Sequence, residues 1–158
     1  MHKLTIAIPT FQRPEQIKRR ILELIPQLTE DTELRVFENG RTDELAAFVR
    51  PYLSEQLHYL PSVNNQGVYR NMLRCIEEGE SEWLWILGDD DAVMPDTVSR
   101  ILGACATTES FAISYRSFTT SNNNVAVVDS IPCLFKETSL SEALFLTSTI
   151  WKRQVLHL

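Results

Sequence analysis

The stretch WLWILGDDD, from Trp83 to Asp91, places five consecutive apolar residues directly before a glycine and three aspartates. A short apolar run with such an abrupt polar end predicts a β-strand buried on both faces, as the strands of parallel sheets are. In open parallel sheets, ligands bind beyond the carboxyl ends of the strands. The stretch therefore predicts both a type of fold and the edge of the sheet at which a site would lie.

Working outward from this stretch, similar apolar runs recur along the chain with helical patterns between them. The further expected strands are Leu4–Pro9, Glu33–Phe37, Leu57–Leu60 and Phe111–Tyr115. Apolar residues recur at helical spacing after Pro14, Asp43, Val68 and Pro95. This alternation predicts the α/β class, as a Rossmann-like three-layer sandwich with a mainly parallel central sheet and helices on both faces.

Several local details can also be predicted. Asp43 is expected to be the N-cap of its helix, and Met72, Leu73 and Ile76 are expected to face inward from the helix Val68–Glu78. After Ser117 the pattern predicts a strand at Val125–Asp129 and a helix at Lys136–Leu146.

Composition limits the class of protein. The 158 residues suit one domain, with 44% apolar and 23% charged residues, and the net charge of −6 argues against a nucleic-acid partner. Cys75, Cys105 and Cys133 lack the spacing of metal ligands, which favours reduced, buried thiols. The chain has no apolar run of about 20 residues and no room for a signal peptide before Leu4. We expect a cytoplasmic location, either free or peripheral at the inner face of a membrane.

Three adjacent aspartates repel one another unless a cation shares their site. A hard divalent cation would remove this repulsion, and Mg²⁺ typically uses one or two carboxylates together with substrate phosphates. The alternative is a solvated acidic turn that caps the following helix. The position directly after a buried strand favours the cation, and Gly88 would let the backbone turn tightly or approach a ligand.

Four segments, in this order, resemble the inverting GT-A glycosyltransferases of the family 2 type. They are IAIPTFQRP (Ile6–Pro14), VFENGRTD (Val36–Asp43), NNQGVYRN (Asn64–Asn71) and WILGDDDAVMP (Trp85–Pro95). In that family the corresponding motifs end in P-T-Y-N-R, in D-[DN]-G-S-T-D, in N-x-G…R-N and in DxD before a proline. The resemblance implies a single GT-A-like domain over residues 1–158, in which residues 1–100 bind a nucleotide sugar and residues 101–158 begin an acceptor half.

The resemblance also implies roles for particular residues. Thr10 would contact the base or ribose, and Phe11 would stack on the base, unless it packs into the core. Arg13 would bind phosphate or lie on the helix surface. Glu38 stands where the family has an aspartate that accepts from a base N–H, as uracil or thymine offers. Arg70 would contact the nucleotide or orient the aspartates, unless it is a surface arginine.

The acidic motif departs from the family's register. Counted back from Pro95, the two DxD aspartates fall on Gly88 and Asp90, and a shift by one residue gives Asp89 and Asp91. We assign Asp90 and Asp91 to a divalent cation, Mn²⁺ or Mg²⁺, and Asp89 to the ribose or sugar.

By resemblance, the reaction would be transfer of a sugar from a nucleoside-diphosphate donor to an acceptor hydroxyl, with inversion and metal assistance. A UDP- or dTDP-sugar is favoured as donor, and a saccharide or lipid-linked glycan as acceptor. Two alternatives stay open: a nucleotide- or metal-binding module without turnover, and a nucleotidyltransferase. The latter would normally carry a glycine-rich loop after the first strand, and TFQRP has no glycine.

A general base for the acceptor is not recognisable in the sequence. Asp129, Glu137 and Glu142 have no base-like context, so we expect the base beyond Leu158 and a truncated chain.

Missing sequence would also leave apolar surface uncovered around Phe145, Ile150 and Trp151, which predicts self-association.

Overall fold

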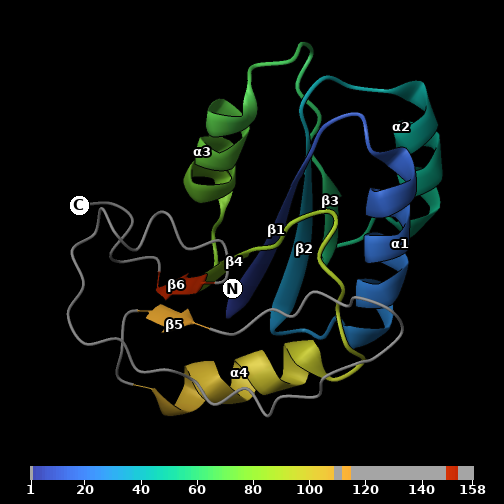
Figure 1. The fold of residues 1–158 in the computed structure, drawn as a ribbon. Coiled ribbons are helices and arrows are strands. Elements are labelled where there is room, and N and C mark those ends of the chain that lie inside the picture. Colours follow the sequence, from blue (N-terminus) through green and yellow to red (C-terminus); the bar gives the residue numbers. More distant parts are fainter. Residues whose placement is uncertain (1, 109–111, 115–148, 153–158) are drawn as a thin grey trace, which may run out of the picture.

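The computed structural model describes residues 2–108, 112–114 and 149–152, which form a six-stranded sheet flanked by helices (Figure 1). The strand order is β3-β2-β1-β4-β6-β5. The strands are β1 (Leu4–Thr10), β2 (Thr32–Glu38), β3 (Leu57–Tyr59), β4 (Trp83–Ile86), β5 (Ala112–Ser114) and β6 (Thr149–Lys152). The first four are parallel, whereas β6 pairs antiparallel with both β4 and β5.

Four α-helices cover the two faces of the sheet: α1 (Pro14–Leu24), α2 (Asp43–Val49), α3 (Val68–Glu78) and α4 (Thr97–Thr107). Two short 3₁₀ helices, η1 (Ile25–Gln27) and η2 (Arg50–Tyr52), follow α1 and α2. Side chains of α1, α2 and α4 share one hydrophobic core, and α3 lies across the sheet from α1 and α2 (Figure 1). The structure thus confirms the α/β three-layer sandwich and the mainly parallel sheet.

Alternation along the strands explains the two cores. Successive side chains of a strand point to opposite faces, so Ile6 and Ile8 join the larger core while Ala7 faces the smaller core under α3. Trp83 and Trp85 are at most 2% exposed and belong to the larger core. The apolar run before the aspartates is therefore buried on both faces, as its sequence predicts.

Some local predictions are wrong. The N-cap of α2 is Thr42, whose Oγ1 accepts a hydrogen bond from the N–H of Leu45 at 3.4 Å, and Asp43 is the first helical residue. Leu73 is 48% exposed, because the sheet-facing side of α3 is set by Asn71 and Cys75. Met72 and Ile76 are half-buried.

Ile150 is only 1% exposed, because β6 inserts between β4 and β5, so the prediction of uncovered surface is wrong at this residue. The prediction for Phe145 lies outside the described residues, as does that for the side chain of Trp151. The same is true of Val125–Asp129, Lys136–Leu146, Cys133 and the acids Asp129, Glu137 and Glu142.

The two cysteines within the described residues are free thiols. Burial raises the pKa of Cys105 to about 12 and that of Cys75 further still, so both thiols stay protonated at neutral pH. None of the helices in the described part of the chain combines the length and apolar character needed to cross a bilayer.

Candidate nucleotide-sugar site

The carboxyl ends of β1, β2 and β4 bring three polar loops to one edge of the sheet. Thr10 and Glu38 are the last residues of β1 and β2 and lie opposite each other in the parallel register. The N–H of Leu87 donates to the carbonyl of Ala7 at 2.9 Å, which leads the chain past β4 to the aspartates at the same edge. The topology therefore assembles the polar residues that follow different strands.

Asp89 is the buried anchor of this edge, with only 6% of its surface exposed. The hydroxyl of Thr10 donates to its Oδ2 at 2.7 Å, and Nη1 of Arg13 donates to its Oδ1 at 3.0 Å. Both carboxylate oxygens therefore have partners from the loop after β1. Asp89 ties that loop to the loop after β4.

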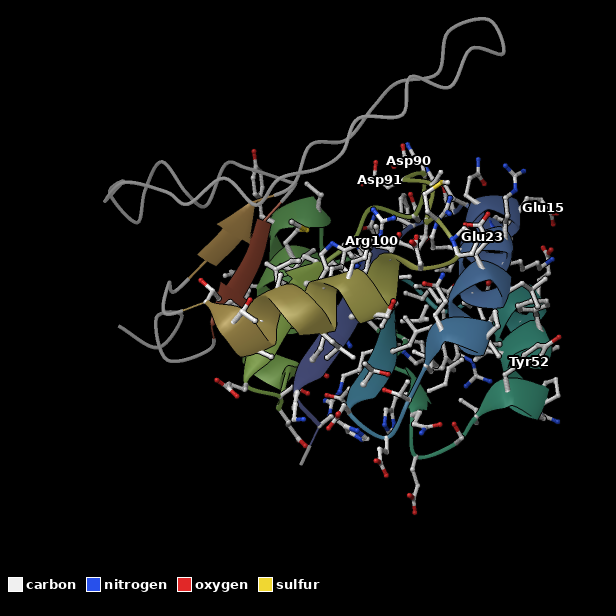
Figure 2. All side chains as sticks on the ribbon, turned by 90° about the horizontal axis from the view of Figure 1, so that it is seen from below. Glu15, Glu23, Tyr52, Asp90, Asp91 and Arg100 are labelled. Atoms are coloured by element: carbon white, nitrogen blue, oxygen red, sulfur yellow. The ribbon has the colours of Figure 1, made fainter. Side chains whose placement is uncertain are left out.

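The carboxylates of Asp90 and Asp91 both fold back onto Gly88. A Cβ placed on Gly88 would stand 3.1 Å from Oδ1 of Asp90 and 2.9 Å from Oδ2 of Asp91. Both side chains lie on the loop after β4 (Figure 2). A side chain at residue 88 would therefore displace the two carboxylates.

This pair of carboxylates suits a hard divalent cation that takes its other ligands from substrate phosphates. Within residues 2–108, 112–114 and 149–152, no group of three or more His, Cys, Asp or Glu side chains converges on a metal position. The chemistry of the donor set nevertheless fits the predicted cation, because Mg²⁺ beside a nucleotide is typically held by one or two carboxylates, and those of Asp90 and Asp91 lie together at Gly88.

Arg13 is the cation that the structure places at the aspartates. Its Nη1 contacts Oδ1 of Asp89 and Oδ2 of Asp90, each at 3.0 Å. The hydrogen bond and charge of Asp89, followed by those of Asp90, raise the pKa of Arg13 above its ordinary value. The preceding residue, Gln12, has a φ of +53°, a left-handed conformation that is uncommon outside glycine and is often found at functional sites. Arg13 thus contacts the aspartates, and its role in binding phosphate stays a prediction.

Glu38 is only 2% exposed and is held by hydrogen-bond donors from two elements. The N–H and hydroxyl of Thr42 donate to its two carboxylate oxygens at 3.0 and 2.6 Å, and the hydroxyl of Tyr59 also donates to Oε2. Burial, followed by the hydrogen bond and charge of Glu38, raises the pKa of Tyr59 well above its usual range. The phenol therefore remains a donor. Among the described residues, Oε1 accepts from Thr42 and Oε2 from both Thr42 and Tyr59, which leaves Oε1 with more spare acceptor capacity.

Phe11 and Arg70 differ in how they relate to this edge. Phe11 is 39% exposed, so the alternative of core packing is wrong for its side chain. Arg70 pairs with Glu77 at 3.0 Å, and both side chains are about half exposed. Arg70 is therefore not brought to the aspartates in this structure, where Arg13 holds them instead.

Sequence reasoning missed a pair of asparagines that join two loops of the site. Nδ2 of Asn39 donates to Oδ1 of Asn65 at 2.8 Å, and the N–H of Gln66 donates to Oδ1 of Asn39 at 2.7 Å. These bonds fix the loop after β2 against the loop after β3. Asparagines in two polar loops that follow neighbouring parallel strands were the available signal.

A parallel sheet whose carboxyl edge carries anchored aspartates and a convergent set of polar loops defines a Rossmann-like nucleotide-binding domain. Residues 5–144 match the family model of glycosyl transferase family 2, and the chain belongs to this family.

Curated relatives of the chain are also named as glycosyltransferases. Over 101 residues the chain is 32% identical to proteins of Mycobacterium tuberculosis and Mycobacterium bovis that are named PGL/p-HBAD biosynthesis glycosyltransferases. This similarity covers 61% of the chain and 39% of the relatives' length. The chain thus corresponds to less than half of these proteins.

Solved structures confirm the GT-A-like fold. Staphylococcus aureus TarS, residues 1–349, in complex with UDP-GlcNAc has a TM-score of 0.72 at 17% identity, covering 98% of this chain and 46% of that one. A mannosyltransferase from Pyrobaculum calidifontis in complex with GDP-Man and Mn²⁺ has a TM-score of 0.66 at 15% identity, covering 98% and 46%. Glucosyl-3-phosphoglycerate synthase of M. tuberculosis with Mn²⁺ and UDP has a TM-score of 0.55 at 14% identity, covering 71% and 42%.

Proposed function

We propose that this edge of the sheet binds a nucleoside-diphosphate sugar, and that the whole protein transfers the sugar to an acceptor hydroxyl with inversion. The observation that carries the proposal is that the carboxylates of Asp90 and Asp91 lie together at Gly88, at the edge where Thr10 and Glu38 also end their strands. Membership of glycosyl transferase family 2 supports the reaction class.

Different residues would bind different parts of the donor. Thr10 and the exposed ring of Phe11 would hold the nucleoside, and Oε1 of Glu38 would accept from a base N–H. Arg13 would bind the diphosphate with its guanidinium. Asp89 holds Arg13 and Thr10 in place and retains acceptor capacity for a ribose or sugar hydroxyl. Arg70 would join the nucleotide only if it left Glu77.

Asp90 and Asp91 would hold a divalent cation, Mn²⁺ or Mg²⁺. When bound, such an ion would neutralise charge on the diphosphate and make it a better leaving group. Support comes from two structural neighbours of different nucleotide type, each solved in complex with Mn²⁺.

The donor base and the acceptor are part of the proposal. A UDP- or dTDP-sugar suits a carboxylate acceptor at Glu38, because uracil and thymine present a ring N–H where cytosine presents a lone pair. A saccharide or lipid-linked glycan is the proposed acceptor. The acceptor-side base would lie outside the described residues.

The first test is a panel of UDP-GlcNAc, UDP-glucose, dTDP-glucose, GDP-mannose and ATP, added with and without Mn²⁺ in a thermal-shift measurement. The UDP- and dTDP-sugars should raise Tm most, and only fully with Mn²⁺, because binding to the folded state stabilises it. Equal stabilisation by ATP, or none by any nucleotide sugar, would contradict the proposal. A second assay distinguishes an enzyme site from a binding module without turnover. The protein is incubated with a UDP-sugar and Mn²⁺, and anion-exchange chromatography measures the UDP released; slow Mn²⁺-dependent release indicates an enzyme site.

A further inference from the structure

Arg13 gives the acidic loop a positive charge of its own. Its single Nη1 lies 3.0 Å from Asp89 and 3.0 Å from Asp90, so one guanidinium nitrogen bridges two of the three adjacent aspartates. Three neighbouring carboxylates would otherwise repel one another. The inference below rests on the proposed function and concerns how the aspartates are held before the donor binds.

The two ends of this bridge differ in exposure. The side chain of Asp89 is 8% exposed and has a second partner in Thr10, whereas that of Asp90 is 66% exposed. Buried charge pairs resist separation, because a lone charge left inside the protein is poorly solvated. Exposed pairs contribute little, because water and salt replace the partner easily. The bond from Arg13 to Asp89 is therefore the durable one, and the bond to Asp90 is the one that can be exchanged.

Asp90 is shared between two cation positions. Its Oδ2 accepts from Arg13, while its Oδ1 lies against Gly88 together with Oδ2 of Asp91. A divalent cation held by Asp90 and Asp91 would be repelled by the guanidinium that already contacts Asp90. A diphosphate would reverse this effect, because its negative charge attracts both cations.

We propose that Arg13 is a positioning residue that holds Asp90 in the absence of metal and makes metal binding depend on the nucleotide. In the nucleotide-free protein, the guanidinium weakens the binding of a divalent cation to Asp90 and Asp91. When a nucleoside diphosphate binds, Arg13 keeps its contact with Asp89, turns from Asp90 to a phosphate, and no longer opposes the cation. Because such coupling is reciprocal, the cation strengthens nucleotide binding by the same factor.

The experiment measures free Mn²⁺ by electron paramagnetic resonance during titration of the protein, with and without UDP. Arg13→Gln should bind Mn²⁺ alone about two- to fivefold more tightly than the wild type, which is the size expected for removal of one partly exposed charge. The same variant should bind UDP in saturating Mn²⁺ about tenfold more weakly, because a charge-assisted phosphate contact is lost. Opposite signs for the two ligands are the signature of the proposed role.

Arg100→Gln is the matched control. Arg100 forms an exposed ion pair with Asp96 at 2.7 Å on α4 and makes no ion pair with Asp89, Asp90 or Asp91. Replacement of Arg100, which Figure 2 labels together with Asp90 and Asp91, should leave the affinities for Mn²⁺ and for UDP at the wild-type values. Arg13→Met, which also removes the charge but keeps an unbranched stem, should repeat the result of Arg13→Gln, and a thermal melt confirms that each variant is folded.

Unchanged or weaker binding of Mn²⁺ alone by both Arg13 variants would overturn the inference, since the guanidinium would then not oppose the cation. Loss of UDP affinity with no gain in Mn²⁺ affinity would mean that Arg13 is only a phosphate ligand, and this result would also overturn the inference. If the wild type bound Mn²⁺ but never UDP, the proposed function would fail, while the Mn²⁺ titration would still decide the role of Arg13.

Discussion

Strands β1 and β2 carry a threonine opposite a glutamate at both of their ends, and the two ends behave differently. Thr5 lies opposite Glu33 at the amino end, and Thr10 lies opposite Glu38 at the carboxyl end. At the amino end, the hydroxyl of Thr5 donates directly to Oε1 of Glu33 at 2.5 Å. At the carboxyl end, Thr10 turns instead to Asp89. The same pair of residue types thus serves two purposes in one sheet.

The amino-end pair belongs to a closed network. Ser81 donates to Oε1 of Glu33 at 3.2 Å, Nε of Arg35 donates to Oε2 at 2.9 Å, and His58 lies 3.7 Å from Oε2. Burial opposes ionisation of Glu33, but the hydrogen bonds from Thr5 and Arg35, the charge of Arg35 and the bond from Ser81 outweigh it, so the pKa lies below its ordinary value. These contacts are all within the protein, which indicates a structural role.

The carboxyl-end cluster is open by comparison. Asp90 and Arg13 are each about half exposed or more, and Phe11 presents part of its ring to solvent. Charges that are held in place but not enclosed can still bind a ligand. The comparison teaches that a threonine opposite a glutamate does not by itself identify the site: Glu33 and Glu38 are equally buried, and the difference is the exposed charge of Arg13 and Asp90 at the carboxyl edge.

Of the substitutions that test this comparison, Glu33→Gln is expected to have the largest effect, a loss of stability. Among the described residues, the substitution leaves the guanidinium of Arg35, which is 12% exposed, with the exposed carboxylate of Glu80 as its one charged partner. Breaking a buried pair in this way should lower the free energy of unfolding by about 3 kcal/mol. Urea denaturation measures the loss, and the affinity of the folded variant for UDP should stay unchanged.

Glu80→Gln is the control for this substitution, because it removes the exposed partner of the same arginine and should cost less than about 0.5 kcal/mol. The pKa of Glu33 is depressed in the folded protein, so its stabilising effect is complete above its ordinary value of 4.5 and is lost as the pH falls through the folded pKa. The difference in the free energy of unfolding between the wild type and Glu33→Gln should therefore become smaller as the pH is lowered below 4.5. Equal stability at pH 7 would contradict a structural role.

A smaller and more selective effect is expected from Glu38→Gln. The carboxylate is proposed to accept from a pyrimidine N–H, so the variant should lose about 1.5–3 kcal/mol of binding free energy for UDP relative to ADP, whose adenine has no N–H on its six-membered ring. Titration calorimetry with both nucleotides measures this selectivity. Glu44→Gln, an exposed acid paired with Lys18, is the control and should not change it.

An equal loss for UDP and ADP would mean that Glu38 only supports the fold. In that case the hydrogen bonds of Glu38 to Thr42 and Tyr59 would serve the fold, and Glu38 would have the same structural role as Glu33.

Most of the fold could be predicted, because buried parallel strands and amphipathic helices leave strong periodic signals. The helix Val68–Glu78 has the predicted bounds, and each of β1 to β5 agrees to within two residues. The error at Leu73 has a physical cause: Asn71 faces the sheet because its Nδ2 donates to the carbonyl of Phe37 at 2.8 Å. A periodicity argument that counts only apolar residues does not detect such a polar contact.

The site was predictable in position and not in its contacts. The carboxyl-edge rule placed the aspartates, Thr10 and Glu38 together, because it depends only on strand order. The bridge from Arg13 to Asp89 and Asp90, and the bond from Tyr59 to Glu38, depend on where long side chains point. Neighbouring residues in the sequence do not determine this direction, since the partners are more than 20 residues apart.

The most direct test of the account is calorimetric titration of UDP into the wild type and the Asp90→Ala/Asp91→Ala double variant, each with Mn²⁺ and with EDTA. The wild type should bind UDP more tightly with Mn²⁺, and the double variant should bind it equally under both conditions, because the two carboxylates that lie together at Gly88 are gone. Asp96→Ala, which removes an exposed aspartate paired with Arg100, should behave like the wild type. Equal Mn²⁺-dependent binding by the wild type and the double variant would contradict the assignment of this loop as the metal and diphosphate site.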